Sequence, residues 1–123
     1  MRRRWAMVCC CFLLVLGFTT DKAPATTGSD LLGFPENVRA IYVAGVIDGW
    51  GEVGTLIRQS KDPSPELAVI DRMFGDLARC AAGRKMTRAQ AGAIVDKFLK
   101  DNPAKWHDPA GSLIWEAFTN VCR

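Results

Sequence analysis

Apolar residues recur at steps of three and four along four segments of the chain, which is the spacing of one buried stripe on a helix. The first segment begins near Pro35 and runs toward Arg58. We expect its stripe to pack on the other helices, with Gly45 inside it allowing a neighbouring helix to approach closely. The segment Gly49-Trp50-Gly51 is a candidate bend or break, because glycine weakens a helix. The stripe consists of Val38, Ile41, Tyr42, Gly45, Val46, Val53, Leu56 and Ile57.

Three further helices are predicted between residues that typically begin or end a helix. The expected starts are Ser64 with Pro65, Thr87 with Gln90 as a capping box, and Asp108 with Pro109; the expected ends are Gly83 and Asn102-Pro103. The apolar faces are Leu67, Ile70, Phe74, Leu77 and Ala81, then Ala91, Ile94, Val95, Phe98 and Leu99, then Leu113, Ile114, Ala117, Phe118 and Val121. No strand-like alternation stands out, so the pattern predicts an all-α fold, a small single-domain bundle of about four helices.

The first 25 residues have the three parts of a secretory signal peptide. Arg2, Arg3 and Arg4 precede an apolar stretch from Trp5 to Phe18, and a polar stretch then ends in Ala23-Pro24-Ala25. The apolar stretch is shorter than the roughly 20 residues of a membrane-spanning helix. We therefore expect cleavage after Ala25, a flexible segment over residues 26–34 and a folded domain over residues 35–123, with no membrane association after cleavage.

Removal of this leader changes the charge of the chain. The full sequence has 16 basic and 13 acidic residues. The leader contains four of the basic residues and one of the acidic ones, which leaves 12 of each. A mature chain with no net charge, and no basic run with interleaved aromatic residues, does not favour nucleic-acid binding.

Cysteine usage points to one disulfide. Cys9, Cys10 and Cys11 leave with the leader, so Cys80 and Cys122 are the two cysteines of the exported chain. Export delivers a protein to an oxidising compartment, where two cysteines most simply pair with each other. The bond would pin the fourth predicted helix to the end of the second.

The exported chain carries few residues suited to catalysis or metal binding. His107 is its one histidine, and Cys80 and Cys122 lack the close spacing of metal ligands. Asp48 and Glu52 are four residues apart, as catalytic carboxylates can be, but a solvated helix face explains them better. We find no phosphate loop, dinucleotide fingerprint or nucleophile elbow. The sequence predicts a protein that is no enzyme and needs no cofactor or metal.

The loop from Asn102 to Asp108 is the best candidate for a partner-binding site. It contains Lys105, Trp106, His107 and Asp108. Trp106 either covers the end of the bundle, with His107 bonding a helix end, or the two side chains face a partner, since tryptophan is enriched at binding hot spots. The polar turn from Gln59 to Ser64 is the second candidate.

The order of several short motifs is similar to that of the type VI secretion amidase immunity proteins of the Tai and Rap type. These motifs are Tyr42-Val43-Ala44-Gly45-Val46-Ile47-Asp48-Gly49, Cys80, Met86-Thr87-Arg88-Ala89-Gln90, Val95 to Pro103, His107-Asp108-Pro109-Ala110, and Phe118 with Cys122. The resemblance extends over about residues 38 to 122. Many members have a further cysteine ahead of the first motif, where this chain has Ala40 and Ile41.

The resemblance implies a small periplasmic helical protein that binds a peptidoglycan amidase and blocks its active site. The shared motifs are mostly caps, core residues and cysteines, so they imply the fold more directly than the function. A small periplasmic stress chaperone and an envelope assembly factor are the alternatives. Whether the protein forms a homodimer is left open.

Overall fold

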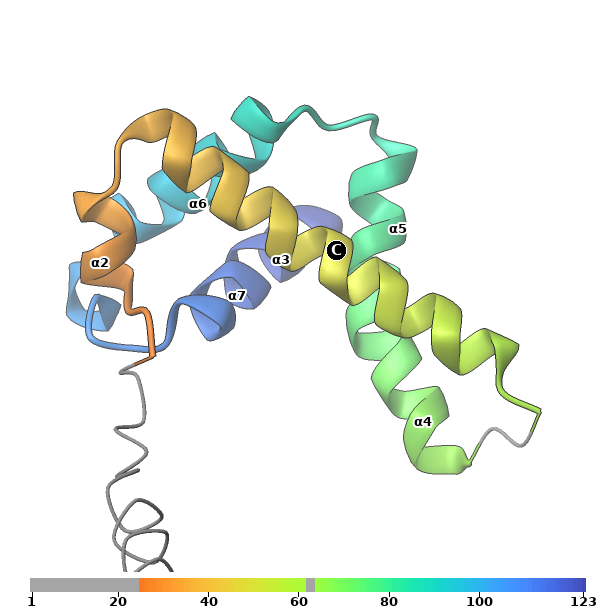
Figure 1. Ribbon diagram of the computed structural model, residues 1–123. Helices are drawn as coiled ribbons and strands as arrows, with labels where there is room; N and C mark the ends of the chain where they lie inside the picture. Colours follow the sequence, from red (N-terminus) through yellow and green to blue (C-terminus); the bar gives the residue numbers. More distant parts are fainter. Residues whose placement is uncertain (1–24, 62–63) are drawn as a thin grey trace, which may run out of the picture.

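The computed structural model describes residues 25–61 and 64–123, and the expected signal peptide lies outside them except for Ala25. The described chain is all-α, as the sequence predicts (Figure 1). Its helices are α2 (Gly28–Gly33), α3 (Glu36–Gln59), α4 (Pro65–Ile70), α5 (Asp76–Gly83), α6 (Arg88–Asp101) and α7 (Ala110–Cys122). A π-helical turn, η1 (Asp71–Gly75), joins α4 to α5, and a 3-10 turn, η2 (Pro103–Lys105), follows α6.

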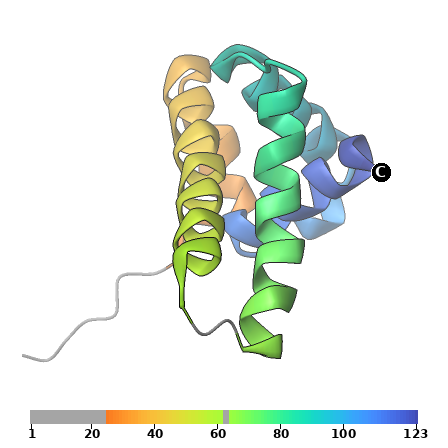
Figure 2. The same cartoon turned by 90° about the vertical axis from the view of Figure 1, so that its right-hand side faces the viewer.

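The long helix α3 packs against α6 and against the rod formed by α4, η1 and α5. It runs without interruption through Gly49-Trp50-Gly51, so the break suggested for these residues is absent. By length and composition it is also the one described helix that could cross a membrane. In this fold it is the central packing element. Figures 1 and 2 show its C-terminal half and α4 projecting together as a helical hairpin beyond α6 and α7.

The expected inward stripe of α3 is largely wrong. The residues of α3 that the bundle buries are Ala40, Val43, Ile47, Gly54 and Ile57, and of these Ile57 alone belongs to the expected stripe. Two further members of the expected stripe, Tyr42 and Val46, are partly buried against the core. The reason is the close approach of α6: a Cβ built on Gly92 would lie 3.1 Å from the Cα and from the Cβ of Ala40. Small residues are therefore needed at this contact. Val43, Ile47 and Ile57 are buried along with Ala40, whereas Val38, Ile41 and Leu56 are exposed.

Most of the predicted helix caps are confirmed. The Ser64 hydroxyl accepts the backbone N–H of Leu67 at 3.3 Å, and Thr87 and Gln90 form the reciprocal capping box. The cap expected at the last helix is wrong, because α7 begins at Ala110 with Pro109 in the cap position and no side-chain cap bond.

Residues 28–33 form a helix where the sequence suggested a flexible segment. Thr27 and Asp30 cap it reciprocally, and Leu31 is 0% exposed. Arg39 of α3 donates to the carbonyls of Leu31, Leu32 and Phe34 at 3.1 to 3.3 Å, which satisfies the free carbonyls at the helix end. The polar residues read as a flexible tail are thus the caps of a docked helix.

The disulfide between Cys80 and Cys122 is present, with 6.0 Å between the two Cα atoms. It joins α5 to the last residue of α7, as predicted. The core it borders consists mainly of Leu31, Val43, Leu77, Val95, Leu99, Leu113, Ile114 and Phe118.

Candidate functional site

Trp106 combines a structural and an exposed role. Its indole Nε1 donates to the carbonyl of Leu99 at 2.8 Å, near the end of α6, and its own carbonyl accepts the N–H of Ser29 at 2.8 Å. The residue is nevertheless 37% exposed. Trp106 therefore fixes the loop to α6 and α2 and still presents part of its ring to the outside.

The other predicted residues of this loop do not converge on one point. The His107 side chain is 82% exposed, with Nε2 3.5 Å from Oδ1 of Asp108. Lys105 forms an ion pair with Glu116 and lies over the ring of Phe98, 5.8 Å from its centroid. The Asp108 carbonyl accepts the N–H of Gly28 at 3.1 Å. The loop is held in place by hydrogen bonds and an ion pair to other parts of the chain, and His107 is the most accessible of the four predicted contact residues.

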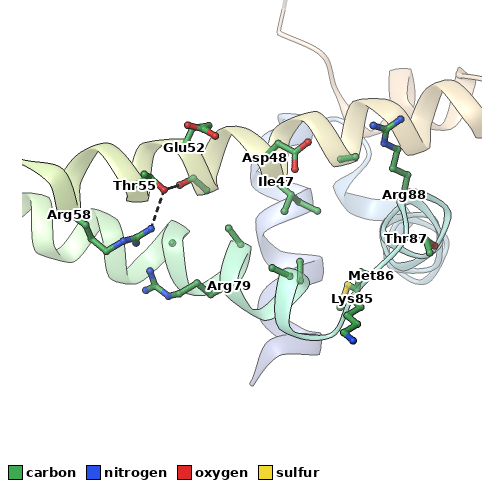
Figure 3. A pocket seen from close by; sticks show the side chains of 16 residues that line it. Ile47, Asp48, Glu52, Thr55, Arg58, Arg79, Lys85, Met86, Thr87 and Arg88 are labelled. Atoms are coloured by element: carbon green, nitrogen blue, oxygen red, sulfur yellow. Dashed lines mark hydrogen bonds between the residues drawn. The ribbon is translucent and has the colours of Figure 1, made fainter.

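A charged groove lies between α3 and the opposite wall formed by α5 and the turn that follows it (Figure 3). It has a volume of about 860 Å³ and a floor of small residues that includes Gly51 and Ala78. Asp48 and Glu52 lie on the α3 wall, and Lys85 and Arg88 lie opposite. Lys85 has a left-handed backbone conformation, with φ at 52°, at the end of α5. Glycine is more usual at that position.

An ion cluster at one end of this groove leaves no room for a side chain at two neighbouring positions, which are both glycine. Asp71 of the π-helical turn accepts from Arg58 at 2.6 Å and lies 3.5 Å from Arg79; Figure 3 shows the two arginines turning toward each other. A Cβ on Gly54 or Gly75 would meet the Asp71 carboxylate at 2.7 or 2.3 Å. The hydrogen bond from Arg79 to Asp76 raises the pKa of the arginine. The cluster joins α3 to η1 and α5, which makes it primarily structural.

An aromatic cleft of about 580 Å³ lies between α3, η1 and α7. Trp50 and Phe74 contact each other across it, with ring centroids 5.7 Å apart, and Met73 and Trp115 complete its apolar lining. The indole N–H of Trp115 is buried without a hydrogen-bond partner among the described residues. Tryptophan and methionine in an open cleft form a surface of the kind that binds protein side chains.

Sequence reasoning missed the cleft because its residues come from three separate segments. No local motif in the sequence connects Trp50, Phe74 and Trp115. Within residues 25–61 and 64–123, no three His, Cys, Asp or Glu side chains converge in a way that could hold a metal ion. Comparison of the chain with protein-family models, with curated proteins and with solved structures finds no match.

Proposed function

We propose that this chain is an exported, non-catalytic binding protein of the periplasm that inhibits a peptidoglycan amidase. The apolar surface around the aromatic cleft is the observation that supports a role in protein binding. Met73 in the lining is 44% exposed, and Val69 and Ile70 are exposed one turn before it. Monomeric proteins rarely expose large contiguous apolar patches that have no function.

The amidase is proposed as the partner because of the resemblance to the immunity proteins. Inhibition of this kind requires a surface that fills or covers the groove of an enzyme, and it requires no catalytic group in the inhibitor. The cleft and the loop from Asn102 to Asp108 are the two candidate contacts. We favour the cleft, because its aromatic side chains can bury a partner residue, whereas Trp106 already donates its N–H to Leu99.

The function is tested by directing a peptidoglycan amidase to the periplasm, with and without this chain, the amidase being one encoded at the same locus. We expect the amidase alone to lyse the cells and co-expression to restore growth, with a complex measurable from the purified proteins. Lysis that is not relieved, together with no measurable complex, would remove the immunity function and favour the stress-chaperone alternative.

Met73→Asp is expected to weaken binding of the amidase by about 2 kcal/mol or more, because a charge would be buried in the contact. The fold should remain intact, since Met73 is partly exposed in the free protein. Binding is measured by calorimetry and folding by circular dichroism. Ala89→Asp on α6 adds the same charge at an exposed position outside the cleft and should change neither.

Trp106→Ala distinguishes between the cleft and the loop from Asn102 to Asp108 as the surface that binds the amidase. If the cleft is the contact, this variant keeps its affinity for the amidase and loses only the stability that the bond to Leu99 provides. If instead Trp106→Ala weakens binding in a folded protein and Met73→Asp does not, the loop is the contact and our choice of the cleft is wrong.

A further inference from the structure

The charged groove between α3 and α5 contains four charged side chains that pair with nothing in the described chain. Asp48 and Glu52 belong to α3, and Lys85 and Arg88 belong to the opposite wall. None of the four forms an ion pair with another described residue. Figure 3 shows Asp48 on the side of α3 that faces the opposite wall, and Lys85 and Arg88 together at one end of the groove. Acidic and basic groups therefore line the same groove without neutralising each other.

The other two charged residues of the groove are neutralised within the chain. Arg58 pairs with Asp71 at 2.6 Å, and Arg79 pairs with Asp76. Both arginines have a counter-charge in the fold, so the charge left for a ligand is acidic on α3 and basic on the opposite wall. A ligand that matches this arrangement presents a cation to α3 and an anion to the other wall. A zwitterion has these two charges in one molecule.

Lys85 is held in a backbone conformation that favours glycine. Its φ is 52°, and it is the one non-glycine residue with a positive φ within residues 25–61 and 64–123. The left-handed region brings the Cβ of an L-residue close to its own backbone, a cost that glycine avoids. Residues strained in this way cluster at ligand sites. The lysine ammonium has no ion-pair partner in the fold, so it is free to contact a bound anion.

The floor of the groove leaves room for a peptide main chain. Gly51 of α3 and Ala78 of α5 lie so close together that a Cβ built on the glycine would be 3.5 Å from the Cβ of the alanine. The floor therefore consists of backbone and methyl groups, which suits a main chain with small side chains. The volume of about 860 Å³ lies within the range of small-ligand sites, about 300–1,000 Å³.

We propose that the charged groove binds a short peptide that has a free amino group and a free carboxylate. The ammonium group lies beside Asp48 and Glu52, which are one helical turn apart on the same face of α3. The carboxylate lies beside Lys85 and Arg88, and both ends form charge-assisted hydrogen bonds. The groove shares no lining residue with the aromatic cleft, so peptide binding does not depend on the proposed inhibition of an amidase.

Alanine peptides of two, three and four residues with free ends are the probes, titrated into isotope-labelled protein and followed by NMR. We expect at least one of them to bind with a dissociation constant of about 1 mM or tighter. The amide signals of Gly51 and Lys85 should shift, and that of Trp115 in the cleft should not. Acetylating the amino group or amidating the carboxylate should each weaken binding about tenfold, because each removes one charged hydrogen-bonding end.

Charge-removing variants test which wall binds which end of the peptide. The Asp48→Asn, Glu52→Gln double variant should bind free and acetylated peptides equally well. The Lys85→Gly, Arg88→Gln double variant should bind the free peptide and its amide equally well. Lys85→Gly alone should melt no lower than the parent protein, since glycine adopts the left-handed backbone without strain.

Arg84→Gln is the matched control, because Arg84 is an exposed cation beside Lys85 that does not line the groove. It should bind the peptides like the parent protein, and so should Met73→Asp, which alters only the cleft. Loss of amidase inhibition and loss of peptide binding are thus measured by separate variants. Three results overturn the proposal: no peptide binds, acetylated or amidated peptides bind as well as free ones, or both double variants retain the parent's preference for free ends.

Discussion

Replacing Cys122 with alanine is expected to lower the free energy of unfolding by about 2–5 kcal/mol. The bond joins residues 42 positions apart. On the chain-entropy model, closing a loop of that length lowers the conformational entropy of the unfolded chain, which stabilises the folded state by about 4 kcal/mol. This is a large part of the net stability of a small domain, which is about 5–15 kcal/mol. α7 would also lose its covalent attachment to α5.

Urea unfolding with and without a reducing agent measures this effect. The parent protein should lose stability on reduction, and the Cys80→Ala, Cys122→Ala double variant should be equally unstable in both conditions. Peptide mapping without reduction, on protein directed to the periplasm, should recover Cys80 and Cys122 linked. Two free thiols in exported protein, or a parent protein whose unfolding does not respond to reduction, would contradict the assignment.

Leu31→Ala is expected to lower the free energy of unfolding by about 2–5 kcal/mol. Leu31 is 0% exposed and belongs to the core cluster that contains Leu99, Leu113 and Phe118. Removing its side chain leaves a cavity under α2, which the surrounding structure can fill only in part. Thermal and urea unfolding of the purified protein measure the change.

Leu32→Ala is the matched control for this experiment. Leu32 is the next residue of the same helix and is only partly buried at the edge of the core. It should cost distinctly less than Leu31→Ala. Equal and negligible effects of the two substitutions would mean that residues 26–34 are a flexible tail, as the sequence pattern suggested, and that α2 is not docked.

Interactions between residues close together in the chain, such as helix caps, could be predicted from the sequence. Ser64 and Thr87 cap their helices because each needs only a backbone N–H three residues ahead. The cysteine pairing could be predicted because the expected export and loss of the leader cysteines left two candidates, Cys80 and Cys122. The loop from Asn102 to Asp108 was found as a segment, but the bonds that hold Trp106 to Leu99 and Ser29 depend on how α2 and α6 meet.

Tertiary packing decided which face of α3 is buried and whether α2 docks. Periodicity shows that a helix has apolar positions, but α3 is apolar around much of its circumference, so the pattern alone could not choose a side. The side that faces α6 is the one with Ala40, because only small residues at Ala40 and Gly92 let the two helices approach so closely there. That choice leaves Val38, Ile41 and Leu56 exposed. The burial of Leu31 likewise required α6 and α7 to be in place, since a six-residue helix is not stable alone.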